Sequence, residues 1–554
     1  MQFLSSRTFV FSLFTTLLVG GNPIAAGAEG CFSAPYSCYP PGDISPQTPR
    51  QYAPLASAYA DMAWQDFLAL NSPAATDASG NYLPQPSTVN GLNYNSGNYV
   101  AVWQTWTEAR ELFLPNGAKP DPFGSGHNLP AKCLALGRSD VTMLLSRSSK
   151  AGEVAAHDTT RDKVGAPKTQ AQVLDEYVQA LRMGPVVDQN GQYVRFGLNF
   201  NGTMYDYVVD NVLYNKEGQE AFDSNDPNHD KNPVDWPRGQ YQGAVGSLFV
   251  KSSWKILGNG DNPGLFHRVT AYIYDEAGGP FGDEPTVEER CTVEEVGLVG
   301  FHIVHRSNSA PQWVWSTFEH YYNAPWLVDF RAGTPPWKYS FFNQATCPPV
   351  GGMPSCAYNS VPAQPWNPQR PGQTPTQIVR IAAPGDYAES ANGVYQNALR
   401  MYFGGTVWEN YFLVDVQFPT VVDVVNPATG LANENPAYPD GVPSPSFLAN
   451  STLETYIQGV GQGAVTTNGN AVPYDDQMQN IIVNGPVVNP FQRSIFNESG
   501  GSERLTSSCV SCHYDAAMTN GTNANFVFSL SRAQSTQTAS TEPTANPAAE
   551  KPAQ

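Results

Sequence analysis

Apolar side chains recur at helical spacing in the first third of the chain. If this segment is helical, one of its faces carries Leu55, Tyr59, Met62, Ala63 and Phe67. The spacing of three or four positions puts side chains on one side of an α-helix. The same spacing recurs from Val102 through Trp106 and Ala109 to Phe113, and again over residues 171–183. We therefore predict amphipathic helices in all three places.

The middle third alternates with a period of two, which is typical of strands. The alternation is clearest over residues 248–256, and residues 268–274, 296–306 and 312–320 read in the same way. Asp188-Gln189-Asn190-Gly191 precedes a further apolar run and predicts a hairpin turn.

The last third returns to a mixture of both patterns. It predicts a helix near 387–402, a strand near 411–418 and a helix opened by Ser451-Thr452-Leu453-Glu454, a capping-box pattern. Because helices and strands are segregated along the chain rather than alternating, we predict the α+β class, with antiparallel strands.

The ends of the chain differ in composition from the rest. Arg7, an apolar run and Ala26-Gly27-Ala28 predict a signal peptide over residues 1–28. We then expect a large α+β domain over 29–500, a short functional segment over 501–532 packed on it, and a flexible low-complexity tail over 533–554. The Pro-rich stretch 361–375 predicts a surface loop or an internal boundary.

Net charge and hydropathy exclude some classes of partner and indicate the cellular location. The formal net charge of −19 repels phosphate backbones, so no nucleic-acid partner is expected. Apart from the predicted signal peptide no stretch is apolar enough to cross a bilayer, so we expect no stable membrane insertion. These features predict a soluble protein exported to the periplasm.

Cysteine usage fits an oxidising compartment. The chain has eight cysteines, and two of them, Cys509 and Cys512, belong to a motif described below. The spacing of the others suggests disulfides Cys31–Cys38 and Cys347–Cys356. Cys133 and Cys291 then pair by elimination, although sequence alone fixes no connectivity.

Residues 508–513 read Ser-Cys-Val-Ser-Cys-His, and Cys-x-x-Cys-His is the attachment signature of c-type haem. On a short helix, positions i and i+3 share a face, so both sulfurs can reach one haem edge and the imidazole of His513 can bind iron. The alternatives are a local disulfide, half of a zinc site or a redox Cys-x-x-Cys. Zinc would need a second pair of ligands nearby, and a redox motif would be expected in a βαβ context; the sequence shows neither.

The motif resembles that of cytochromes c, and the chain resembles the large, poorly characterised bacterial proteins called cytochrome c family proteins. The stretches that carry the wider resemblance are AWQDFLALNSPA (63–74), GLVGFHIVHR (297–306), WVWSTFEHYYNAP (313–325), LETYIQ (453–458), SCVSCH and FVFSLSRAQ. The resemblance implies one covalent haem c, thioether bonds at Cys509 and Cys512, and iron ligation by His513. It implies no established activity for the rest of the chain.

Little chain follows His513, so we expect residues upstream of the motif to form most of the haem pocket. Met518, five positions on, would lie on nearly the same helix and could not easily reach the opposite haem face. Among upstream histidines, His302 and His320 lie in apolar or aromatic runs, which suit a haem pocket. They are the candidates for the distal iron ligand; for any single one, an ordinary core histidine is the stronger alternative.

Two functions remain open at this point. A six-coordinate haem would transfer single electrons among periplasmic redox proteins. An open distal site would instead allow peroxidase- or oxygenase-like chemistry, and the long upstream chain leaves room for an enzyme.

Overall fold

The computed structural model describes residues 39–87, 98–125, 129–138, 141, 143–145, 186–224, 234–275, 289–332, 338–359, 375–403, 405–420, 442–444, 446–455, 509, 513 and 516–536. The predicted signal peptide, the segment 171–183, the Pro-rich stretch, Cys31, Cys38 and Cys512 lie outside these residues.

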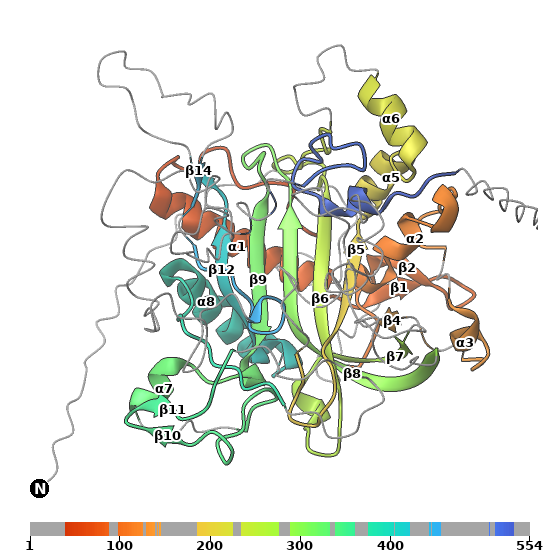
Figure 1. Ribbon diagram of the computed structural model, residues 1–554. Helices are drawn as coiled ribbons and strands as arrows, with labels where there is room; N and C mark the ends of the chain where they lie inside the picture. Colours follow the sequence, from red (N-terminus) through yellow and green to blue (C-terminus); the bar gives the residue numbers. More distant parts are fainter. Residues whose placement is uncertain are drawn as a thin grey trace, which may run out of the picture.

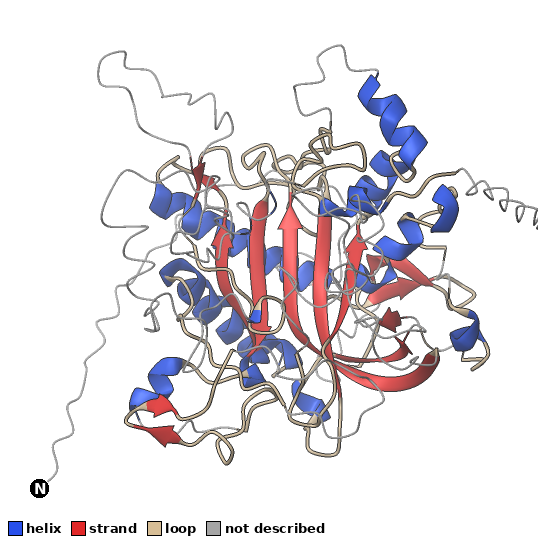
Figure 2. Ribbon diagram, in the orientation of Figure 1, coloured by secondary structure: helices blue, strands red, loops and turns tan. Residues whose placement is uncertain are grey.

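Helices and strands occupy separate parts of the molecule, so the α+β prediction is confirmed (Figure 2). The α-helices are α1 (Tyr52–Leu70), α2 (Ala109–Leu112), α3 (Ala131–Leu134), α5 (Gly202–Asp210), α6 (Lys216–Ser224), α7 (Leu327–Ala332) and α8 (Asp386–Phe403). The main strands are β3 (Thr107–Glu108), β4 (Met143–Leu145), β5 (Arg195–Phe200), β6 (Leu248–Ile256), β7 (Arg268–Asp275), β8 (Arg290–His305), β9 (Val314–His320) and β12 (Tyr411–Gln417). Three small two-stranded sheets are formed by β1 (Ala74–Thr76) with β2 (Tyr82–Pro86), β10 (Pro349–Val350) with β11 (Met353–Pro354), and β13 (Pro419–Thr420) with β14 (Val442–Pro443).

One sheet organises the molecule, with strand order β12-β9-β8-β6-β5-β3. All neighbours in that order are antiparallel, whereas β4 joins the sheet by a parallel pairing with β7. The second half of β8 lies between β6 and β9, while its first half pairs with β7. Figure 2 shows β8 curving strongly between these two parts.

Different segments of the chain pack on the two faces of the sheet. Phe301 and Ile303 of β8 and Phe318 of β9 share a core with α1 and α8, which pack on each other behind the sheet (Figure 1). We call this side the helix face. Because side chains alternate along a strand, Val304 and Trp315 point to the other side, where they meet residues 516–536. We call that side the C-terminal face.

Most of the elements expected from periodicity are present. The five apolar residues predicted on one helical face are all buried in α1, and β6, β7, β8, β9, β12 and α8 match the predicted segments. The hairpin turn is also confirmed: the Gly191 N–H donates to the Asp188 carbonyl at 3.0 Å, just before β5.

The helix predicted from Val102 to Phe113 is wrong. The chain forms a 3-10 turn at Val102–Thr105, an extended residue at Trp106 and the short strand β3 before α2 begins. Thr107 pairs with Phe200 of β5. A chain that bends against the sheet can bury residues at helical intervals without being helical, which explains the misleading period.

Two of the three predicted disulfides lie within the described residues and are present. Cys133–Cys291 joins α3 to the start of β8, and Cys347–Cys356 closes a short loop. Across the same part of the chain, no helix combines the length and apolar character that crossing a bilayer requires.

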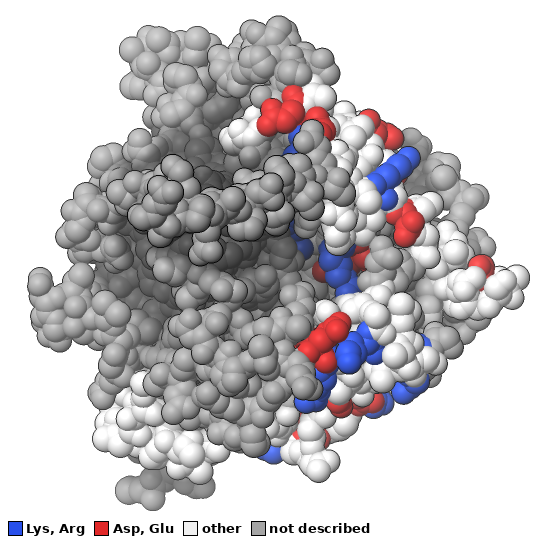
Figure 3. Space-filling view, turned by 45° about the vertical axis from the view of Figure 1, so that its right-hand side comes forward, with Lys and Arg blue, Asp and Glu red and all other residues white. Residues whose placement is uncertain are grey.

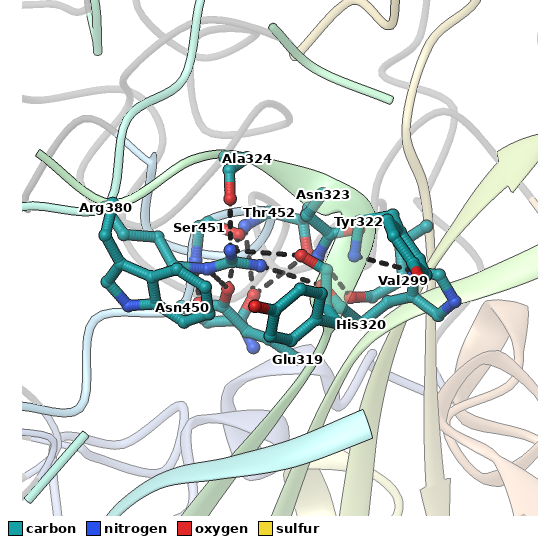
Figure 4. A network of polar contacts seen from close by, with 12 residues as sticks. Val299, Glu319, His320, Tyr322, Asn323, Ala324, Arg380, Asn450, Ser451 and Thr452 are labelled. Carbon is teal, nitrogen blue, oxygen red and sulfur yellow. Dashed lines mark hydrogen bonds and ion pairs between the residues drawn. The ribbon is translucent and has the colours of Figure 1, made fainter. Parts of the chain in front are cut away.

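A buried ionic network fixes residues 450–452 to the C-terminal face (Figure 4). Arg380 Nε donates to Glu319 Oε2 at 2.7 Å, and the Ser451 hydroxyl donates to the same oxygen at 2.7 Å. Asn450 Nδ2 donates to the Phe318 carbonyl of β9 at 2.9 Å. Charge-assisted bonds of this kind hold this chain segment in one register on the sheet.

The cap of this segment differs by one residue from the prediction. Asn450, rather than Ser451, takes the capping role, because its Oδ1 accepts the Thr452 N–H at 2.9 Å. The Glu454 carboxylate accepts the Asn450 N–H at 3.1 Å, four positions back rather than the three of a capping box. The predicted helix beyond residue 455 lies outside the described residues.

Candidate haem-attachment site

Residues 516–536 form a strap across the C-terminal face, beside α5 (Figure 1). Gln219 of α6, which is fully buried, donates to the Leu530 carbonyl at 2.8 Å and accepts from the Thr519 backbone and hydroxyl. Trp236 Nε1 donates to the Ala524 carbonyl at 3.2 Å. Hydrogen bonds to its backbone and burial of its apolar side chains therefore both hold the strap on the large domain.

The strap continues further than the expected start of the tail at residue 533. Ala533 is fully buried, and the Lys216 N–H donates to the Gln534 carbonyl at 3.1 Å. The Glu217 carboxylate accepts the Thr536 N–H at 3.0 Å. Polar composition predicted flexibility here, but backbone bonds to the start of α6 fix residues 533–536.

Two consecutive strap residues have left-handed backbone angles. Asn525 has φ of 49° and Phe526 has φ of 68°. Such angles are unfavourable for a residue with a bulky side chain and persist only where the surroundings impose them. Here Asn525 Nδ2 donates to the Val234 carbonyl at 2.9 Å, which helps to hold the conformation.

The carbonyl of Phe526 accepts a hydrogen bond from Nδ1 of His513 at 2.9 Å. A carbonyl oxygen can only accept, so Nδ1 carries the hydrogen. In a neutral imidazole this leaves the lone pair on Nε2, which is the arrangement found in metal-binding histidines whose other nitrogen is fixed by a backbone carbonyl. The strained strap residue thus sets the tautomer of His513.

Aromatic rings surround the His513 imidazole. Its centroid lies 4.6 Å from the Trp315 ring of β9 and 5.0 Å from the Phe528 ring of the strap. Trp315 is itself almost fully buried among Phe249 and other apolar side chains of the C-terminal face. Apolar surfaces of this kind keep water from the iron in haem proteins.

Cys509 lies on the same side of this arrangement. It is partly buried and packs against the apolar cluster that contains Trp315 and the strap. Cys509 and His513 are both helical and four positions apart, so they share one helical face. Cys512 lies outside the described residues, and its predicted thioether stays a prediction.

Met518 is not part of a helix. The Ala516 N–H bonds to the His513 carbonyl, and residues 517–523 form a tight turn with Gly521 at φ of 89°. Met518 is buried in the apolar cluster of the C-terminal face. The expectation that it continues the helix is wrong, because this turn reverses the chain.

His302 is on the C-terminal face, two residues before Val304 of β8. Its Nε2 lies 2.9 Å from Glu454 Oε2, and its Nδ1 lies 2.7 Å from the Thr317 hydroxyl. Burial alone would raise the pKa of Glu454, but His302 and Lys251 hold that pKa below its usual value. Both ring nitrogens of His302 are thus engaged by protein groups.

His320 is on the helix face, since it follows Phe318 by two residues on β9. Its Nε2 donates to the Leu265 carbonyl at 2.9 Å, and its ring stacks on Phe266 at 4.1 Å. Nδ1 accepts the Tyr322 N–H at 3.3 Å. Burial lowers the pKa of His320 to about 3, so the side chain is neutral. The structure does not bring His320 to the face that carries His513.

The other histidines within the described residues, His267 and His305, do not join the site. His305 is on the helix face with Nδ1 2.9 Å from Asp66 Oδ2 of α1, and His267 contacts Gln104. His127, His157 and His229 lie outside the described residues. Among the side chains that the structure describes, no three metal-binding groups come together. Haem iron needs no such group, because the porphyrin supplies four of its ligands.

Sequence reasoning missed the part played by the strap. The motif identified His513, but nothing in the sequence indicated that the carbonyl of Phe526 would meet it. The closely spaced Phe526 and Phe528 were the one available signal.

No protein-family model, curated protein or solved structure matches the chain. The attachment motif and the surroundings of His513 therefore carry the functional argument.

Proposed function

We propose that this chain is an exported c-type cytochrome that carries one haem and transfers single electrons between periplasmic redox proteins. Cys509 and Cys512 would hold the haem through thioether bonds, and His513 would bind its iron. The observation that carries the proposal is the hydrogen bond from His513 Nδ1 to the Phe526 carbonyl, which fixes the imidazole in the tautomer found in metal-binding histidines.

The haem would supply the redox chemistry, and the residues described here would orient and shield it. The Phe526 carbonyl makes the imidazole a stronger electron donor, which stabilises the oxidised iron. Trp315 and Phe528 pack against the imidazole, and a less polar surrounding would favour the iron state of lower charge. The balance of these two effects would set the potential.

A partner would meet a surface of mixed charge. Although the whole chain is acidic, the described residues in Figure 3 show acidic and basic side chains side by side rather than in separate patches. Encounters steered by net charge would be weak and salt-sensitive, as is usual for transient electron transfer.

The pyridine haemochrome assay on protein matured in a host competent for c-type haem attachment tests the proposal. We expect one covalent haem per chain, and its loss in the double variant Cys509→Ala with Cys512→Ala. His513→Ala should retain the thioethers or fail to mature, but it should in no case give the wild-type iron spectrum.

The matched control is Cys347→Ala with Cys356→Ala, which removes two cysteines from a disulfide elsewhere. This variant should keep its haem. Haem loss in both double variants would indicate a general folding defect, whereas haem retention without Cys509 and Cys512 would refute covalent attachment at the motif.

A further inference from the structure

A cavity of about 250 Å³ opens between α1, the start of α8 and β12. Its floor is formed by alanines, and three of these come from the two helices: Ala56 and Ala60 of α1, and Ala388 of α8. The volume equals that of roughly eight liquid waters, so the cavity suits a small ligand. It involves none of the residues around His513.

One wall of the cavity carries the carboxylate of Asp415 from β12. The Val416 N–H donates to Oδ1 at 2.8 Å, and the Phe447 N–H donates to Oδ2 at 3.2 Å. A carboxylate accepts about four hydrogen bonds. The two backbone contacts therefore fix its position and leave further accepting capacity toward the cavity.

The chain approaches this carboxylate closely at Gly385, just before α8. A Cβ at Gly385 would lie 2.6 Å from Asp415 Oδ1, which no side chain could tolerate without displacing it. Asp386, the first residue of α8, also lines the cavity and adds a second negative charge.

No Lys, Arg or His within the described residues forms an ion pair with Asp415 or Asp386, although ion pairs occur elsewhere on the surface. Burial, with a smaller effect of Asp386, raises the pKa of Asp415 to about 7. Burial and Asp415 raise the pKa of Tyr52 to about 12, so this phenol stays neutral and supplies no countercharge.

Aromatic rings complete the lining. Tyr52 of α1 and Tyr387 of α8 meet edge to face with centroids 5.9 Å apart, and Phe447 also lines the cavity. Aromatic faces attract cations, most strongly where water is excluded. An acidic wall, aromatic rings and an alanine floor together match a positively charged group that carries a short apolar part.

We infer that the cavity is a binding site for a small organic ammonium ion, whose charged nitrogen would contact Asp415 and whose alkyl groups would lie on the alanines. A metal ion fits less well, because no three metal-binding side chains meet there in the described structure. An anion would be repelled by both carboxylates. This inference does not depend on the haem.

Calorimetric titration of the mature, full-length protein with propylammonium and tetramethylammonium tests the inference. Propanol is the neutral control of the same size as propylammonium, and sodium chloride controls for ionic strength. We expect both ammonium ions to bind and propanol not to bind. Binding should weaken as the pH falls from about 8 to about 6, because Asp415, flanked by Asp386, Tyr52 and Tyr387, then takes up a proton.

Three variants locate the site. Asp415→Asn should weaken ammonium binding about tenfold or more. If that variant fails to fold, Asp386→Asn gives the same test with a smaller loss, since its exposed side chain makes no described hydrogen bond. Asp206→Asn removes an equal charge from the exposed side of α5 and should leave binding unchanged.

Equal binding of propanol, equal loss in Asp206→Asn, or no ammonium binding at all would overturn the inference. Binding of Ca²⁺ or Mg²⁺ that depends on Asp415, without ammonium binding, would show that the cavity holds a metal instead.

Discussion

The two faces of the central sheet use different kinds of contact. On the helix face, Phe67 of α1 stacks on Phe318 of β9 at 4.1 Å, and Trp64 stacks on Tyr395 of α8 at 5.3 Å. On the C-terminal face, ion pairs and backbone hydrogen bonds hold segments without regular secondary structure. Two residues of these segments have left-handed backbone angles. Regular helices bury apolar area with little backbone strain. The strap instead adopts strained backbone angles, and these direct the Phe526 carbonyl toward His513. We infer that the helix face supplies stability and the C-terminal face supplies the site.

The largest expected effect separates these two roles with a matched pair of tryptophans. Trp64→Ala and Trp315→Ala each remove a fully or almost fully buried indole and should each destabilise the fold by about 3–5 kcal/mol. Only Trp315→Ala should also shift the haem absorption spectrum and potential, because Trp315 contacts His513. Urea unfolding and redox titration measure the two effects, and a spectral shift in both variants would contradict the division of roles.

A pH effect should come from the helix face. Unfolded His320 takes up a proton below about pH 6.5, whereas the folded side chain does so only near pH 3. Its contribution is therefore fully present above pH 6.5 and is lost as the pH falls toward 3, by roughly 2 kcal/mol at pH 5.

The variant His320→Gln removes this titration. We expect its stability to fall less than that of the wild type between pH 8 and pH 5, as measured by urea unfolding at each pH. Parallel losses in the two proteins would show that His320 is not held neutral. The quantity to compare is the difference between the two losses of unfolding free energy, because the other groups titrate in both proteins and their contributions cancel.

A smaller effect is expected from the strap. Asn525→Ala loses the bond to the Val234 carbonyl and keeps a side chain at positive φ, so it should cost about 1–2 kcal/mol. Asn525→Gly relieves the backbone and should cost less. Both should alter the iron potential through His513, and an unchanged potential in Asn525→Ala would argue that the strap does not set the imidazole.

The smallest expected effect is on the spin state of the haem iron, which depends on its sixth ligand. Both ring nitrogens of His302 and of His320 already have protein partners. We therefore expect His302→Gln and His320→Gln to leave the spin state of the haem unchanged in absorption and electron paramagnetic resonance spectra. A change to high spin in His302→Gln alone would show that this side chain leaves Glu454 to bind iron.

The sequence predicted those parts of the fold in which local pattern and tertiary burial agree. The amphipathic spacing of α1 and the alternation of β6 follow directly from which side faces the sheet. The helix predicted from Val102 to Phe113 was wrong, because the apolar spacing there comes from a bent chain that pairs with β5. Short elements such as β4 depend on distant partners and had no local signal.

The candidate site was predicted only as far as its Cys-x-x-Cys-His motif. Cys509 and His513 were visible because attachment chemistry requires fixed spacing. The Phe526 carbonyl and the partners of His302 and His320 arise from contacts across many residues, and left-handed angles at Asn525 and Phe526 contradict local preference. Such contacts are decided by packing of the strap on the large domain.

Mass spectrometry of the tryptic peptide Leu505–Arg532 tests the central claim most directly. The peptide contains Cys509, Cys512 and His513 and no internal cleavage site. In protein matured where haem attachment operates, we predict the peptide mass plus one haem, with fragment ions that place it on the two cysteines. The mass of the bare peptide, or of a peptide with an internal disulfide, would contradict the account.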